Sequence, residues 1–130
     1  MKTRNEAVEA CLQLGMCYED YPFHDSNWTV MRHNGTQKSF AMIYYRNGFM
    51  CINLKATPDD CVLLRHMFSS VEAAYHMNKK HWITLRLDGD MTDDQILKLI
   101  EDVNQKYGNT VIMVTHNDAI KNMADRVIRL

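Results

Sequence analysis

The alternation of apolar and polar residues is most regular over residues 82–88, where it predicts a β-strand with two unlike faces. The two alternating sets are Ile83, Leu85 and Leu87 against Trp82, Thr84 and Arg86. Successive side chains of a strand point to opposite faces, so these sets lie on opposite sides of a sheet. Asp88-Gly89 then predicts a turn, because glycine tolerates a positive φ and aspartate bonds its own backbone.

Three further strands are predicted earlier in the chain, at about residues 28–32, 38–45 and 49–54. Asn34-Gly35 separates the first two, and Asn47-Gly48 separates the last two. Asn-Gly is a strong hairpin signal, and turns this short leave only antiparallel pairing. Residues 71–75 are expected to be a short extended segment. Residues 16–27 show no clear period, and Tyr21 and Phe23 are expected to cover the edge of the core.

Three helices are predicted from their starting residues and their apolar stripes. Thr3 with Glu6 forms a capping box that opens a helix over about residues 4–14. Thr57-Pro58 opens a second helix that ends at Ser69-Ser70. A third helix follows the capping pair Thr92 and Gln95, with its apolar stripe at Ile96, Leu99, Ile100 and Val103. The order predicts an α+β fold of two layers, an antiparallel sheet of about five strands with helices on one face.

Composition and charge limit the function classes. A chain of 130 residues with 46% hydrophobic and 24% charged residues is typical of one globular domain. No apolar run approaches the ~20 residues of a membrane span. The four cysteines form no Cys-x-x-Cys pair, and together with ten methionines they suit a reducing cytoplasm. A net charge of −1 argues against a strong nucleic-acid binder, so such binding needs a local basic patch.

The candidate patch lies in the basic run before the last strand. Its predicted residues are Lys79, Lys80, His81 and Trp82, joined by Arg65 and Arg86. Lysines in line can contact phosphates, and an exposed tryptophan can stack on an unpaired base. Alternatively, Trp82 is a half-buried anchor and the lysines only keep the loop hydrated. Two functions therefore stay open, weak DNA binding without sequence preference and a protein-protein interaction module.

No catalytic, cofactor or metal site is predicted. Cys61 and His66 are five residues apart on one helix, about 500° of rotation, so they do not share a face as a nucleophile and its base would. His76 and His81 have no carboxylate at a metal-ligand spacing. Four acidic residues lack the spacing and the final glutamate of a calcium loop: Asp88, Asp90, Asp93 and Asp94. We expect turn and helix-capping roles for them, and we expect the chain not to be an enzyme.

Several separated motifs resemble the MmcQ/YjbR family of small bacterial proteins. They are Tyr21-Pro22-Phe23, Asn53-Leu54-Lys55 before Thr57-Pro58, and the run from Tyr75 to Trp82 followed by a strand and Leu87-Asp88-Gly89. The resemblance covers about residues 3–100, so residues 1–100 are predicted to form an MmcQ/YjbR-like domain. It implies a two-layer α/β fold like that of secretion chaperones and a role in DNA binding. The family pattern supplies no catalytic residues.

The tail, residues 101–130, resembles the C-terminal end of an exporter-type ABC transporter ATPase. Residues 110–117 and 124–130 carry this resemblance, and it implies that His116 would sense a γ-phosphate. The sequence holds no Gly-x-x-x-x-Gly-Lys-Ser/Thr, ABC signature or second Walker motif, so nothing in it can cradle phosphates. We therefore expect no ATPase site, although the label of an ABC transporter ATP-binding protein fits the tail. Its apolar residues 111–114 are expected to pack on the same domain or on a partner chain.

Overall fold

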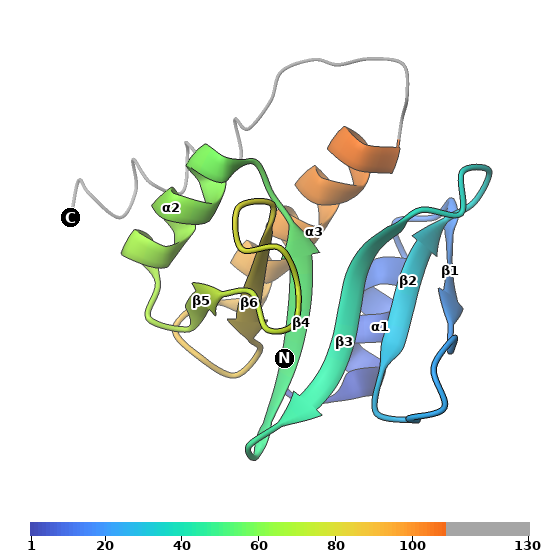
Figure 1. Cartoon of the computed structure of the whole chain (residues 1–130), viewed down its shortest axis with the longest axis horizontal. Helices are drawn as coiled ribbons and strands as arrows, with labels where there is room; N and C mark the ends of the chain where they lie inside the picture. The colour runs from blue at the N-terminus through green and yellow to red at the C-terminus, as the bar shows by residue number, and fades with distance from the viewer. Residues whose placement is uncertain (109–130) are drawn as a thin grey trace.

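The computed structural model describes residues 1–108, with side chains as far as residue 105. A twisted antiparallel sheet forms one layer, and helices pack against it (Figure 1). The elements in chain order are α1 (Arg4–Leu12), β1 (Cys17–Asp20), β2 (Thr29–His33), β3 (Ser39–Arg46), β4 (Phe49–Lys55), α2 (Pro58–Met67), β5 (Val71–Ala73), β6 (Trp82–Arg86) and α3 (Asp93–Gly108). The predicted α+β class is confirmed.

The sheet has six strands in the order β1-β2-β3-β4-β6-β5, one more than the approximate number predicted. The additional strand is β1, in the segment where no period was found. It forms by pairing with β2, with Cys17 opposite His33 and Asp20 opposite Val30. A four-residue strand is too short to show a period of its own, so tertiary pairing decides its structure.

The predicted helix starts are confirmed in atomic detail. The Thr3 hydroxyl accepts from the Glu6 amide at 3.1 Å, and the Glu6 carboxylate accepts from the Thr3 amide at 3.1 Å. Thr57 caps α2, with Pro58 in the first helical turn. Thr92 and Gln95 bond reciprocally at 2.9 and 3.2 Å before α3. These bonds satisfy amides that the helices cannot pair themselves.

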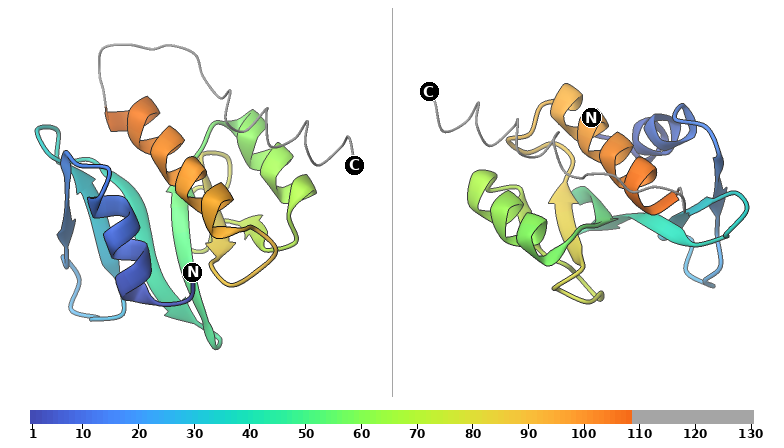
Figure 2. Two further views of the ribbon diagram at one scale, coloured as in Figure 1. Left: turned by 180° about the vertical axis from the view of Figure 1, so that it is seen from behind. Right: turned by 90° about the horizontal axis from the view of Figure 1, so that it is seen from above.

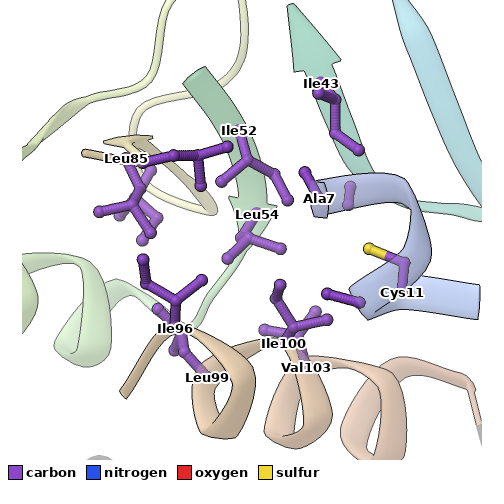
Figure 3. Close-up of a cluster of buried hydrophobic side chains, with 14 of the residues drawn as sticks. Ala7, Cys11, Ile43, Ile52, Leu54, Leu85, Ile96, Leu99, Ile100 and Val103 are labelled. Carbon is purple, nitrogen blue, oxygen red and sulfur yellow. The ribbon is translucent and has the colours of Figure 1, made fainter. Parts of the chain in front are cut away.

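The main hydrophobic core lies between the sheet and the helices, as Figure 3 shows. Ile43, Ile52, Leu54 and Leu85 point from the strands toward residues of α1 and α3. The helical residues in this view are Ala7, Cys11, Ile96, Leu99, Ile100 and Val103. Leu64 of α2 belongs to the same core. The apolar members of the predicted stripes therefore meet on one face of the sheet, as expected.

Glycine is required in two turns for two different physical reasons. Asn47 and Gly48 both have positive φ, 52° and 88°, as a type I′ hairpin requires. Gly89, by contrast, is not among the glycines with positive φ. A Cβ at position 89 would lie 2.3 Å from the Ser70 Cβ. Close approach to Ser70, not backbone freedom, therefore requires the glycine, which corrects the reason predicted for this turn.

Within residues 1–108, no helix is both long and apolar enough to cross a membrane. α3 runs without a break past residue 100, where the family-like pattern of the sequence stops. The predicted phosphate sensor His116 and the predicted packing of residues 111–114 lie outside the described residues.

Candidate functional site

The candidate site is the face of the sheet that α1 and α3 do not cover. In the right-hand view of Figure 2, these two helices lie on one side of the sheet, and the loop between β5 and β6 lies on the other. We call this loop, residues 74–81, the covering loop, and we call this side of the sheet the helix-free face. Strand register puts Tyr44 opposite Cys51 and Asn53 opposite Thr84 on this face.

Three buried polar side chains form a hydrogen-bonded network under the covering loop. The Tyr44 hydroxyl and the Thr84 hydroxyl each donate to Asn53 Oδ1 at 2.7 Å. Asn53 Nδ2 donates to the Tyr75 carbonyl at 3.0 Å, and the Tyr75 amide donates to Thr84 Oγ1 at 2.8 Å. Tyr44, Asn53 and Thr84 are all completely buried. This polar network satisfies itself while it holds both backbone groups of Tyr75 in place.

The pKa of the central hydroxyl supports its role as a donor. Burial raises the pKa of Tyr44 to about 12, and the hydrogen bond with Thr84 only partly opposes this shift. Tyr44 therefore stays protonated at every physiological pH and keeps its bond to Asn53.

A row of aromatic rings crosses the helix-free face. The Trp28 ring stacks on Tyr44 with centroids 4.2 Å apart, and Tyr44 stacks on Tyr75 at 5.7 Å. Phe23 meets Trp28 edge-on at 6.4 Å, and the His76 ring lies 4.0 Å from Tyr75. Phe23 and His76 are exposed, whereas Trp28 and Tyr75 are half-buried. We call Phe23, Trp28, Tyr75 and His76 the aromatic row, with Tyr44 as its buried floor.

The covering loop has a left-handed residue inside it. His76 has φ 59°, a conformation that non-glycine residues adopt only at a cost. Such strain persists where the surroundings fix the backbone, and it is concentrated at functional sites. Here the two hydrogen bonds to the Tyr75 backbone provide that fixation.

Three cations of this face each lie over an aromatic ring. The Arg46 guanidinium is 4.1 Å from the Tyr75 ring centroid, and that of Arg86 is 4.4 Å from Phe49. Lys55 Nζ is 5.5 Å from the Trp82 centroid. Contacts of this length are favourable for a cation above a ring face.

Two ion pairs join strands of the sheet, one between β3 and β5 and one between β2 and β1. Arg46 bonds Glu72 at 3.0 Å, and Arg32 bonds Asp20 at 2.7 Å.

The predicted nucleic-acid residues are only partly brought together. Lys79, Lys80 and His81 are exposed side by side at the end of the covering loop. The Lys79 ammonium donates to the Ala74 carbonyl at 2.7 Å, so it also closes the loop. Arg65 is exposed on α2, one turn beyond Cys61, whose thiol donates to the Lys80 carbonyl at 3.4 Å. Arg65 therefore lies on the helix that contacts the end of the covering loop.

Two of the predicted residues do not fit the predicted role. Trp82 is only 7% exposed, so it is an anchor, and the hypothesis that its ring stacks on a base is wrong. Arg86 lies at the opposite end of β6 from the lysines, about 13 Å along the strand at ~3.3 Å per residue. It packs on Phe49, and its Nε atom has no hydrogen-bond partner in the described part of the chain.

The sequence prediction missed Lys55 as a neighbour of these cations. The Ala56 amide donates to the His81 carbonyl at 2.9 Å, which joins the end of β4 to the covering loop. We call Lys55, Lys79, Lys80 and His81 the basic edge. Burial lowers the pKa of Lys55, and the charge of Lys38 lowers it further. Lysines thus gather here from two separate segments, the end of β4 and the end of the covering loop.

The described residues provide little for catalysis. They contain no group of three or more side chains placed to hold a metal ion. Burial raises the pKa of Cys61, which keeps its thiol protonated and a poor nucleophile. The thiol's contacts, to backbone carbonyls of Lys80 and Trp82, are structural.

The sequence is similar to a known protein family and to proteins of Escherichia coli. The family model described as YjbR matches residues 12–103. The uncharacterized protein YjbR of Escherichia coli strain K12 is 32% identical over 84 residues, which cover 65% of this chain and 71% of that protein. The uncharacterized protein YbdF of E. coli O157:H7 is 34% identical over 65 residues, 50% of this chain and 53% of that protein.

Solved structures of two other proteins share this fold. A crystal structure of a protein from Pseudomonas syringae is 28% identical, with a TM-score of 0.71, and the match covers 79% of this chain and 97% of that one. The Deinococcus radiodurans protein DR2400, which has a DUF419 domain, is 25% identical with a TM-score of 0.69, over 96% of this chain and 89% of that one.

Proposed function

The chain belongs to the YjbR family, as its motifs predicted, and from this premise we propose that it is a small cytoplasmic module that binds DNA weakly and without sequence preference. The observation that supports the proposal best is the basic edge. Lys55, Lys79, Lys80 and His81 come from a strand end and a loop that are joined by the bond between Ala56 and His81. The three lysines supply cations that can contact phosphates, and the His81 ring adds a hydrogen-bonding group.

The expected affinity is low because the patch is local. The chain has a net charge of −1, so no general attraction adds to the basic edge. With two to four phosphates neutralised, the slope of log affinity against log salt should be about −2 to −4. A gel-shift or anisotropy titration over salt measures this slope directly.

The decisive variant carries Lys79→Glu with Lys80→Glu, and we expect it to lose measurable binding at low salt. Since Lys79 also closes the covering loop, Lys80→Glu alone serves as a second variant that leaves this bond intact, and it should weaken binding. The matched control is Lys2→Glu with Lys98→Glu, which makes the same charge change at exposed positions of the N-terminus and α3. Equal binding by the control and the edge variants would show that the basic edge is wrongly assigned.

A protein-protein interaction module is the second candidate. Tyr21 and Phe23 are 53% and 52% exposed, which contradicts their predicted role at the core edge. Aromatic residues are enriched at protein interfaces, so this loop is suited to a partner protein. Absence of any DNA binding at low salt would favour this candidate. An ABC ATPase function is not proposed, because the sequence lacks the phosphate-binding motifs.

A further inference from the structure

We infer that the nucleic acid bound by this chain is single-stranded and that its unpaired bases stack on the aromatic row of the helix-free face. This inference rests on the proposed function, since it names the form of nucleic acid that the same face takes. The bases would lie on Phe23, Trp28, Tyr75 and His76, while the phosphates lie along the basic edge.

The aromatic row offers unpaired bases an exposed ring at each end, Phe23 and His76, backed by the half-buried rings of Trp28 and Tyr75. The Trp28 and Tyr75 rings are nearly parallel, 6° apart in orientation, with centroids 6.4 Å apart. Phe23 and His76 extend the row with exposed rings at its two ends. α1 and α3 pack on the face of the sheet opposite the covering loop, as Figure 2 shows. Every base has a π-face, so stacking on such a row is independent of sequence.

The aromatic row is also held rigidly before any ligand arrives. The polar network bonds both the amide and the carbonyl of Tyr75, and Tyr44 supports the rings from below. The left-handed backbone of His76 places its ring against Tyr75. A surface that is already ordered loses less conformational freedom on binding.

A single nucleic-acid strand could contact the aromatic row with its bases and the basic edge with its phosphates. Tyr75 and His76 lie near the start of the covering loop and Lys79 and Lys80 near its end, so two rings and two cations fall within six residues. The Arg46 guanidinium lies 4.1 Å from the Tyr75 ring, but its charge is paired with Glu72 at 3.0 Å, so the lysines carry the phosphate contacts. A double helix exposes its phosphates but hides the faces of its bases, so it could use only the basic edge. A single strand exposes both.

Fluorescence of Trp28 provides the test. The chain has two tryptophans, and the variant Trp82→Phe leaves Trp28 as the only reporter. We compare an oligothymidylate with an abasic oligonucleotide of equal length, which keeps the phosphates but has no bases. Stacking predicts quenching of Trp28 by the oligothymidylate alone, and binding of the abasic strand weaker by about fivefold or more.

Should Trp82→Phe not fold, the unmodified chain is compared with Trp28→Phe, and the quenching should disappear in that variant. Phe23→Ala and His76→Gly should each weaken oligothymidylate binding several-fold. Tyr45→Ala is the matched control, because Tyr45 is 53% exposed, as Phe23 is at 52%, but lies outside the row. Glycine adopts the left-handed backbone of position 76 without strain but gains freedom in the unfolded chain, so chemical denaturation of His76→Gly must show that the variant is folded.

The outcomes separate the two proposals. If both oligonucleotides bind equally and Trp28 is not quenched, the stacking inference is overturned while DNA binding through the basic edge stands. If a duplex binds more tightly than the single strand, the inference is overturned as well. If neither oligonucleotide binds at low salt, the proposed function and the inference both fall, and a protein partner for this face becomes the better hypothesis.

Discussion

Strand β4 shows how differently the two faces of the sheet are buried. On the helix-covered face, Ile52 and Leu54 are completely buried among the aliphatic side chains of Figure 3. On the helix-free face, Asn53 between them is equally buried, but among a hydroxyl, a phenol and a backbone carbonyl. The two environments are separated by the thickness of a single strand.

The two faces differ in whether their stabilising contacts depend on direction. Apolar burial is non-directional, so the helix-covered face tolerates any close packing of the right volume. Each buried polar group of the helix-free face instead needs a partner at a fixed place, because an unpaired one costs about 1–3 kcal/mol. The covering loop is fixed in that way, and it carries both the aromatic and the basic side chains of the proposed site.

The largest predicted effect tests whether the helix-free face is a second core. Trp82→Ala should lower the free energy of unfolding by about 3–5 kcal/mol, as truncation of a buried aromatic side chain does. Trp82 is 7% exposed, and its ring also lies below the Lys55 ammonium. Chemical denaturation measures the loss.

The neighbouring variant His81→Ala is the control, since His81 is exposed and its loss should change stability by less than about 0.5 kcal/mol. A Trp82→Ala protein as stable as His81→Ala would mean that only the helix-covered face stabilises the fold.

A smaller effect is expected from the polar network. Asn53→Ala removes the acceptor of two hydroxyl donors and the donor to Tyr75, and it should cost about 1–3 kcal/mol. The covering loop should loosen at the same time, which hydrogen exchange of the Tyr75 amide would report. Leu54→Ala, its neighbour on the other face, should cost about 2–5 kcal/mol without loosening the loop.

Tyr44→Phe provides the finer control, because it removes one hydroxyl and keeps the ring. We expect a loss of about 1 kcal/mol, since Asn53 Oδ1 still accepts from Thr84. The double variant with Asn53→Ala should cost less than the sum of the two single losses. Strict additivity would show that the three side chains do not act as one network.

The helix-covered face of the sheet and the elements that form it could be predicted from the sequence. Apolar periods and capping residues such as Thr3 and Thr92 are local signals, and the elements that they predict agree with the structure to within a few residues. β1 could not be predicted, because its pairing with β2 depends on partners ten to sixteen residues away. Gly89 was expected for its backbone freedom in a turn, but the close approach of Ser70 is what requires a glycine there. The period of the sequence does not reveal this contact between distant residues.

The site was harder to predict, for a physical reason. Asn53 and Thr84 come from different strands, and only register brings them together with Tyr44. The sequence run from Lys79 to Trp82 indicated the covering loop, yet alternation alone left open whether Trp82 faces solvent. Lys55 belonged to a family-like motif and Trp28 to a predicted strand, but neither signal indicated a part in this site. The contributions of rings from separate segments therefore appeared only in three dimensions.

The smallest predicted effect concerns a polar cluster that is exposed. The Asp90 carboxylate accepts from the amides of Ser69 and Ser70 at 2.8 and 3.0 Å, and from their hydroxyls at 3.2 and 2.5 Å. Partial burial opposes ionisation, but the bonds from Ser70 and Ser69 outweigh it and hold the pKa of Asp90 at about 2, below its ordinary 3.8. A lowered carboxyl pKa stabilises the fold above the ordinary value, and this contribution is lost as pH falls toward about 2.

Because Asp90 is exposed, solvent screens its contribution, and Asp90→Asn should cost less than about 1 kcal/mol at neutral pH. The difference in unfolding free energy between the natural chain and this variant should shrink between pH 4 and pH 2. Urea denaturation at several pH values measures it. If burial decides the value of a polar contact, Asp90, with its four hydrogen bonds, must matter less than Asn53, with three. A loss for Asp90→Asn that equals that of Asn53→Ala, or that does not change with pH, would contradict this explanation.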